Sequence, residues 1–399
     1  MAKKKRRRRR AFAGLPATPP EILTADPCAP KPEMSLIAYG PDVFQEMPIS
    51  DAKQIVGMVG KQPVLWLNVD GLGDAKAIDE IGDVFNLHHL ALEDVLHPVQ
   101  RAKVDIYPEQ IFAVMRMPVP GMAPDTEQLS MFLGKNYIIT FQEMPGGDVL
   151  DPLRDRLRKS WGMIRTMGPD YLLYAIIDTV CDSYFPVLEK YGEKLDELED
   201  KIFDKSSKNN AKQIHAIKRD IISIRRAVWP LRDAVASLYR DKMPMISEET
   251  QFHLRDCYDH VLRIMDLVET SREYSQDLMD LHLSNVSNRM NEVMKTLTII
   301  TAAIMAPTLI AGIYGMNFNP AVSAFNMPEL NWPYGYPMAL FLMVASALTA
   351  LLYFKSRGWL GNDDASAAES NGQQISSQQT QPIELQQPTA TAPGGNSKD

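Results

Sequence analysis

The sequence has few cysteines and none of the common catalytic motifs. Its three cysteines, Cys28, Cys181 and Cys257, are scattered, so they have neither the density of a disulfide framework nor the paired spacing of a zinc finger. The chain also contains no Walker phosphate loop, no nucleophile elbow and no HExxH motif. We therefore expect neither an enzyme nor an organic cofactor, and we do not expect transport driven by ATP.

Charged residues are absent from two long apolar runs near the C-terminus. Residues 296–316 form a run of 21 residues without an ionisable side chain, which is about the length of a helix that crosses roughly 30 Å of hydrocarbon. Residues 337–354 form a second, shorter run, whose ends can be anchored at the membrane interfaces by the aromatic residues Tyr334, Tyr336, Tyr353 and Trp359. These runs predict two transmembrane helices, with a buried soluble hairpin as the alternative.

Basic residues flank the two runs but are missing between them. Arg289 and Lys295 precede the first run, and Lys355 and Arg357 follow the second, whereas the connector 317–336 has no Lys or Arg. Because basic loops stay on the cytoplasmic side, both termini should be cytoplasmic and the connector external. We expect a multi-pass protein of the cytoplasmic (inner) membrane.

The two ends of the chain lack any hydrophobic period. Residues 1–35 are basic and then Pro-rich, and residues 355–399 combine the basic end of the second run with a tail rich in Gln, Ser and Thr. We expect both ends to be disordered. Anionic lipid is the contact that we expect for the basic arm, rather than nucleic acid, and no specific contact is the alternative. Without the eight basic residues 3–10 the formal net charge falls from -8 to -16, so the body of the chain suits divalent cations better than phosphates.

The remainder divides into a mixed region and a helical region. Residues 36–165 carry short apolar strands around one helical stretch at 78–96, which predicts a cytoplasmic domain with both strands and helices; the strands are 64–69, 111–117, 129–133 and 137–143. Residues 166–295 predict a stalk of long helices, with breaks near 206–210 and Pro244. The last helix should run from Glu248 to Met316, about 100 Å at 1.5 Å per residue.

One face of this last helix carries small, polar or flexible residues through the membrane run. Its members recur at steps of three and four, so they share one face of the helix: Asp280, Ser284, Ser287, Asn291, Met294, Thr298, Thr301, Met305, Thr308 and Gly312. We call this set the polar stripe. In lipid, a polar face must contact protein or water. The stripe therefore predicts either a tight helix interface, with hydroxyls that can also bond back to their own helix, or a water-filled pore.

A pore requires several copies of the chain, because two spans cannot enclose a conduit. The stripe has no carboxylate within the membrane run, so it cannot replace the oxygen shell of a bare divalent ion. Mg²⁺ gives up its bound waters reluctantly. Amide and hydroxyl oxygens that contact those waters could pass the hydrated ion.

A set of motifs resembles the CorA family of magnesium channels. YGMNF stands at 314–318, MPEL at 327–330 and WL at 359–360, and the resemblance extends through 92–101 (LEDVLHPVQR), 255–260 (RDCYDH) and 286–300 (VSNRMNEVMKTLTII). The family implies a funnel-shaped homopentamer with an α+β cytoplasmic domain, a long helical stalk and two transmembrane helices. It also implies a passive Mg²⁺ channel, with cobalt and nickel as further ions, that is driven by the membrane potential and gated by cytoplasmic Mg²⁺.

The resemblance assigns roles to individual residues. The selectivity filter would be Gly315, Met316 and Asn317, with the Asn317 amide holding the hydrated ion. The positions implied to line the pore are Asp280, Asn291, Met294, Leu297, Met305, Thr308 and Gly312. Asp94 and Asp256 match the intersubunit regulatory metal site. The connector departs from the family pattern because it is longer and has Asn319 after the GMNF segment, which leaves Glu329 as the only external acid.

Two other functions fit parts of the sequence. A zinc transporter of the ZntB type shares the architecture, and His89, Glu93 and His97 could share a helix face with zinc-ligand chemistry, although Pro98 ends that helix. A membrane-anchored sensor or scaffold that passes no ion could use the acidic helix at 189–204, although such a run is more often a solvated face.

Overall fold

The computed structural model describes residues 23–121, 123–146, 149–203, 209–241, 243–319, 323 and 325–360. The basic run 3–10 and the tail beyond Leu360, for which the sequence predicts disorder, lie outside the described residues. The chain divides into two compact units, Met1–Leu283 and Ser284–Asp399, which we describe separately.

A seven-stranded mixed sheet forms the centre of the first unit. Its order is β2-β1-β3-β7-β6-β5-β4, and all neighbouring strands are antiparallel except the parallel pair β3 and β7. The strands are β1 Glu33–Tyr39, β2 Phe44–Ile49, β3 Val64–Asp70, β4 Lys103–Tyr107, β5 Gln110–Pro118, β6 Thr126–Leu133 and β7 Tyr137–Gln142. The sequence predicts four of them, and the structure adds β1, β2 and β4.

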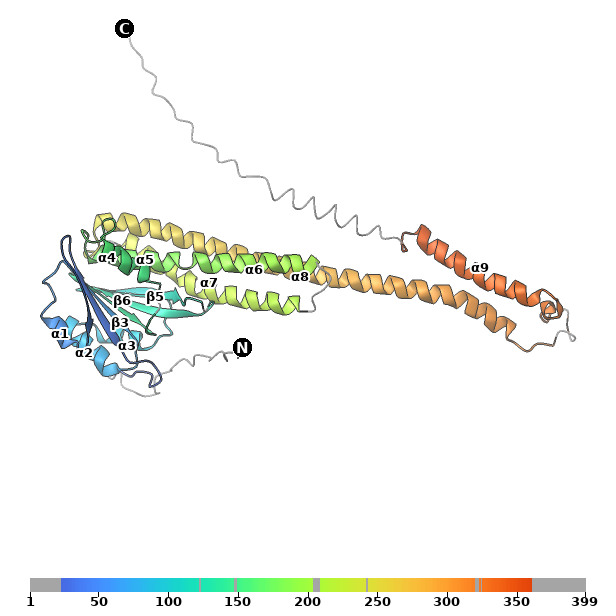
Figure 1. The fold of residues 1–399 in the computed structure, drawn as a ribbon, viewed down its shortest axis with the longest axis horizontal. Helices are drawn as coiled ribbons and strands as arrows, with labels where there is room; N and C mark the ends of the chain where they lie inside the picture. The colour runs from blue at the N-terminus through green and yellow to red at the C-terminus, as the bar shows by residue number, and fades with distance from the viewer. Residues whose placement is uncertain are drawn as a thin grey trace, which may run out of the picture. The chain divides into compact units, whose positions relative to one another are not determined.

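Three short helices cover one face of the sheet (Figure 1). They are α1 Lys53–Val56, α2 Ala75–Phe85 and α3 His89–Leu96. The prediction of one helix over 78–96 is wrong, because Asn86 takes the left-handed conformation (φ 50°) that ends α2, and His88 is extended before α3. Asn adopts this conformation at lower cost than most residues, since its short polar side chain tolerates a positive φ.

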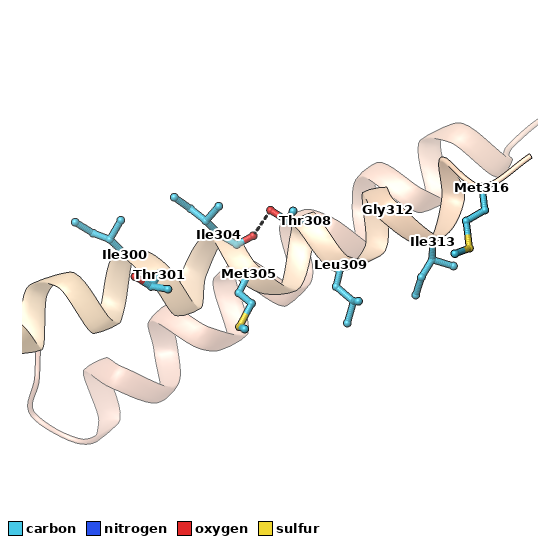
Figure 2. Close-up of a pocket in the computed structure, with 9 residues that line it drawn as sticks. All are labelled: Ile300, Thr301, Ile304, Met305, Thr308, Leu309, Gly312, Ile313 and Met316. Carbon is cyan, nitrogen blue, oxygen red and sulfur yellow. Dashed lines mark hydrogen bonds between the residues drawn. The ribbon is translucent and has the colours of Figure 1, made fainter.

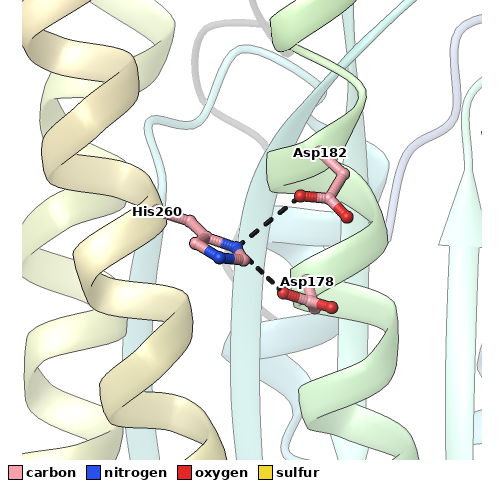
Figure 3. Close-up of side chains that lie close together, drawn as sticks. All are labelled: Asp178, Asp182 and His260. Carbon is pink, nitrogen blue, oxygen red and sulfur yellow. Dashed lines mark ion pairs between the residues drawn. The ribbon is translucent and has the colours of Figure 1, made fainter.

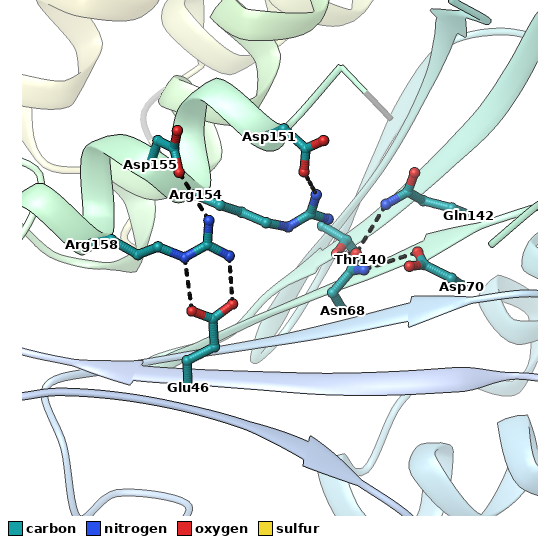
Figure 4. A network of polar contacts seen from close by, with 9 residues as sticks. All are labelled: Glu46, Asn68, Asp70, Thr140, Gln142, Asp151, Arg154, Asp155 and Arg158. Atoms are coloured by element: carbon teal, nitrogen blue, oxygen red, sulfur yellow. Dashed lines mark hydrogen bonds and ion pairs between the residues drawn. The ribbon is translucent and has the colours of Figure 1, made fainter. Parts of the chain in front are cut away.

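The other face shares a hydrophobic core with α4 Asp151–Lys159, α5 Pro169–Asp182, α6 Phe185–Phe203 and α7 Asn210–Arg240. Polar contacts fix α4 to the sheet: Arg158 donates two hydrogen bonds to Glu46 of β2 (2.9 and 2.8 Å), as Figure 4 shows. A buried network lies beside this pair, in which Asn68 accepts hydrogen bonds from Thr140 (2.7 Å) and Gln142 (3.0 Å). These bonds satisfy polar groups that would otherwise be costly to bury.

The segment Pro169–Phe203 is apolar and long enough to cross a membrane. More than half of its most apolar stretch is buried within the first unit, where it forms α5 and α6 with a turn at 183–184. Its hydrophobicity therefore belongs to the core.

The helix α8, Glu248–Tyr314, begins at the residue that the sequence predicts and continues into the second unit. In the first unit an apolar seam of α8 packs into the core, with Leu254, Val261 and Val268 fully buried and Tyr258 and Met265 partly buried. The buried seam explains why a helix of 67 residues is stable on this side.

The second unit contains the rest of α8, the short 3-10 helix η1 Pro328–Asn331 and α9 Gly335–Ser356. Both α8 and α9 contain stretches long and apolar enough to cross a membrane, at the two places where the sequence predicts spans. Within one chain only 6% of each stretch is buried, so lipid or other subunits must cover them.

Candidate ion pathway and cytoplasmic cation sites

All ten residues of the polar stripe are exposed in the single chain, and so is Leu297. They lie on α8 between Asp280 and Gly312, which places them on one continuous element. Polar side chains at membrane depth need a protein or water contact. No other part of the described chain packs on this face, so an assembly of chains must provide the contact with protein or with water.

The threonines of the stripe bond to their own helix. Thr298, Thr301 and Thr308 each donate a hydrogen bond to the carbonyl four residues earlier, at 2.7–2.8 Å (Figure 2 shows the bond of Thr308). A hydroxyl group has one proton and two lone pairs. Because the proton is used within the helix, the lone pairs can accept hydrogen bonds from water. This arrangement suits contact with a hydrated cation, whose waters donate.

The same face forms an open hollow towards the C-terminal end of α8 (Figure 2). Four stripe residues line it together with apolar neighbours; the lining is Ile300, Thr301, Ile304, Met305, Thr308, Leu309, Gly312, Ile313 and Met316. Polar and apolar positions therefore meet along one side of the helix.

The predicted filter follows directly after α8. The helix closes with two backbone hydrogen bonds, from Gly315 to the Ala311 carbonyl (2.9 Å) and from Met316 to the Ile313 carbonyl (3.2 Å). Asn317 is the first residue beyond these bonds, and its side chain is exposed. The external acid Glu329 lies in η1 and is partly buried.

Side chains of the same chain contact the carboxylate of Asp94. Lys103 Nζ lies 2.6 Å from Asp94 Oδ2, and Gln100 Nε2 donates to Asp94 Oδ1 at 2.7 Å. Among the contacts of the described residues, none joins Asp94 to Asp256. Within one chain the two predicted regulatory residues therefore have different contact partners.

Asp256 lies beside an acidic cluster that the sequence does not predict. His260 Nδ1 of α8 is 3.4 Å from Asp178 and 3.6 Å from Asp182, both on α5 (Figure 3). Its Nε2 is 3.8 Å from Asp256. Burial, followed by repulsion from Asp182, raises the pKa of Asp178. The imidazole of His260 and the carboxylates of Asp178 and Asp182 are close enough to bind one divalent cation. The sequence signal for this cluster is two pairs of residues spaced four apart: Asp178 and Asp182 on α5, and Asp256 and His260 on α8.

The candidate zinc ligands of α3 are not brought together. His97 lies at the C-terminal cap of α3, where its Nδ1 is 2.8 Å from the Glu93 carbonyl. Within the described part of the chain, the group of three metal-ligating side chains close enough to share an ion is Asp178, Asp182 and His260. The alternative based on His89, Glu93 and His97 therefore has no support from the geometry.

Comparisons with known proteins agree on one family. Residues 61–356 match the sequence model described as "CorA-like Mg2+ transporter protein". The cobalt/magnesium transport protein CorA of Thermotoga maritima is 40% identical over 331 residues, which cover 82% of this chain and 92% of that protein.

Two solved structures share the fold. The complete CorA magnesium transporter from Methanocaldococcus jannaschii superposes with a TM-score of 0.69 at 22% identity, covering 82% of this chain and 98% of the other. The ZntB cytoplasmic domain from Vibrio parahaemolyticus superposes with a TM-score of 0.51 at 15% identity, covering 65% of this chain and 99% of the other. The zinc-transporter fold is thus the more distant of the two.

Proposed function

This chain belongs to the CorA family of Mg²⁺ transporters, and we propose that it forms a homopentameric channel through which Mg²⁺ passes into the cytoplasm. Transport of magnesium and cobalt, rather than catalysis, is the activity that the family and its named relative support. The observation that carries the proposal for this chain is the exposed polar stripe on α8, which leads to Asn317.

The chemistry of the stripe favours a hydrated ion. Its membrane portion offers hydroxyl oxygens and thioethers without a carboxylate, so it cannot compensate Mg²⁺ for the loss of its water shell. The threonine lone pairs and the Asn317 amide oxygen can accept hydrogen bonds from that shell. We assign Asn317, with Gly315 and Met316, to the filter. The pore below it is lined by Gly312, Thr308, Met305, Leu297, Met294 and Asn291, with Asp280 at the cytoplasmic mouth.

The membrane potential supplies the driving force in this account. A doubly charged ion gains about 4.6 kcal/mol when it crosses 100 mV. The sequence has no Walker loop that could couple transport to ATP. A passive channel with both termini in the cytoplasm accounts for the charge distribution around the two spans.

We further assign cytoplasmic Mg²⁺ sensing to Asp94 and Asp256, facing each other across a subunit boundary. Two carboxylates that approach closely repel unless a cation lies between them, so a bound ion would hold neighbouring subunits together. The position of Asp256 beside His260, Asp178 and Asp182 supports this assignment, because it places a cation-attracting cluster at the same part of α8. If the closed state binds the ion better, Mg²⁺ shifts the population towards that state.

The test of the pathway is the substitution Asn317→Ala in purified protein reconstituted in liposomes. We expect Mg²⁺ uptake to fall by at least about tenfold, because one amide contact to the hydrated ion is lost in every subunit. Asn319→Ala is the matched control, since this exposed asparagine lies two residues further along and outside the filter. Wild-type uptake by Asn317→Ala, with an intact oligomer in size-exclusion chromatography, would remove Asn317 from the pathway.

A further inference from the structure

A lysine ammonium group is held between two carboxylates at the predicted regulatory position. Lys103 Nζ is 2.6 Å from Asp94 Oδ2 and 2.6 Å from Asp105 Oδ2. Lys103 and Asp105 are two residues apart on β4, so they lie on the same face of the strand. Asp94 lies in the last turns of α3.

Each oxygen of the Asp94 carboxylate is in contact with a neighbouring side chain. Lys103 holds Oδ2, and Gln100 donates to Oδ1 at 2.7 Å. The side chains of Lys103 and Asp94 are 31% and 25% exposed, so solvent screens their interaction less than that of a surface ion pair. Burial lowers the pKa of Lys103, but its bonds to Asp105 and Asp94 outweigh burial and raise it. The ammonium group is therefore a permanent positive charge.

A metal ion at Asp94 needs one of these oxygens, directly or through a bound water. The ammonium group is bonded to Oδ2 and repels a second cation. We propose that Lys103 is a tethered counter-ion that competes with Mg²⁺ for Asp94 and is transferred to Asp105 when the ion binds. The inference rests on the proposed role of Asp94 in sensing.

Asp105 lowers the cost of displacing Lys103 from Asp94. When Lys103 leaves Asp94, it keeps one ion pair, because its contact with Asp105 is already as short as its contact with Asp94. Displacement therefore costs less than breaking a solitary pair, yet the competition still weakens Mg²⁺ binding. Such a site releases its ion when the cytoplasmic concentration falls, as feedback requires.

The account predicts opposite effects for the two partners of Asp94. Lys103→Met keeps the aliphatic stem and removes the competing charge, so Mg²⁺ should bind more tightly. Asp105→Asn removes the alternative partner, so Lys103 should remain on Asp94 and Mg²⁺ should bind more weakly. A purely structural ion pair would weaken the site in both variants.

The experiment measures the Mg²⁺ concentration that half-protects the detergent-solubilised full-length protein from chymotrypsin, whose aromatic cleavage sites none of these variants alters. We expect this concentration to fall about threefold or more in Lys103→Met and to rise about twofold or more in Asp105→Asn. Lys103→Arg, which keeps the charge, should stay within about twofold of the wild type. Lys103→Gln replaces Lys103→Met if the latter does not assemble.

Two controls separate the possible failures. Arg101→Met removes an exposed positive charge two residues away. An equal shift of the half-protective Mg²⁺ concentration in this variant would show that any nearby positive charge has the same effect, and it would overturn the tethered exchange. Lys103→Met should have no effect in an Asp94→Asn background. If Asp94→Asn alone leaves the half-protective concentration unchanged, the proposed sensing role of Asp94 fails. If only Asp94→Asn changes it, the role of Lys103 is overturned and that of Asp94 stands.

Discussion

Two of the three cysteines lie against each other in the core of the first unit. The Sγ atoms of Cys181 on α5 and Cys257 on α8 are 3.7 Å apart, and both side chains are buried, whereas Cys28 is exposed. The contact with Cys181, followed by burial, raises the pKa of the Cys257 thiol well above its ordinary value. The thiolate is the reactive form, so proximity alone does not make this pair reactive.

We therefore predict that a thiol reagent such as 5,5′-dithiobis(2-nitrobenzoate) modifies one cysteine per native chain at neutral pH. The native count should fall to zero in Cys28→Ser, and denaturation should raise the wild-type count to three. Absorbance at equilibrium provides the measurement. Rapid modification of two or three thiols in the native wild type would contradict the burial of the pair.

Individual residues show which features can be predicted from the sequence and which cannot. The polar stripe could be predicted because steps of three and four on one helix fix a common face. The cluster around His260 could not, because Asp178 and His260 lie on different helices whose faces meet only after folding. The ion pair between Asp94 and Lys103 was likewise hidden, since it joins α3 to β4 through a turn of unpredicted shape.

At the scale of elements, the start of α8 is tied to the start of α5. The backbone N–H and the hydroxyl of Ser247, the residue before α8, both donate to Asp170 Oδ2, at 2.9 and 2.6 Å. The Ser247 hydroxyl oxygen in turn accepts from the Thr250 N–H at 3.3 Å, which caps the helix. Burial raises the pKa of Asp170, but the bonds from Ser247 outweigh burial and lower it.

We predict that Asp170→Asn lowers the free energy of unfolding by about 2 kcal/mol at neutral pH, because hydrogen bonds to a charged acceptor are lost. Asp266→Asn, at an exposed position of α8, should have little effect. Thermal unfolding in detergent provides the measurement.

The effect should depend on pH in one direction. Because the pKa of Asp170 is lower in the folded state, its contribution is present above the ordinary carboxyl pKa of 3.8 and is lost as the pH falls through the folded value. The difference between wild type and Asp170→Asn should therefore shrink in acid. A difference that grows as the pH falls would contradict the assignment.

Long hydrophobic patterns predict the long helices, but the short strands have too little pattern of their own to be predicted. The start of α8 and both spans follow from long, uninterrupted patterns. The strand β4 has only five residues, two of which are the charged Lys103 and Asp105, and β2 contains Pro48 at the edge of the sheet. Such strands depend on their neighbours more than on their own sequence.

At the scale of the whole molecule, the exposed surfaces require other copies of the chain. The second unit leaves both the polar stripe and the apolar flanks of α8 and α9 exposed. Lipid can cover the apolar flanks, but it cannot cover the stripe. In the channel that we propose, a closed ring of identical chains would cover the flanks and turn the stripe to a central pore. The sequence indicates this need for an oligomer, and the number five rests on the resemblance to the family.

The most direct measurement of the central claim is ion uptake by the purified protein in liposomes, with Mg²⁺ and Zn²⁺ compared in parallel. An inside-negative potassium diffusion potential is applied with and without a proton gradient, and Asn317→Ala liposomes serve as the control. The account predicts Mg²⁺ uptake that increases with the potential and needs no proton gradient. Zn²⁺ uptake that requires a proton gradient, without Mg²⁺ uptake, would contradict it.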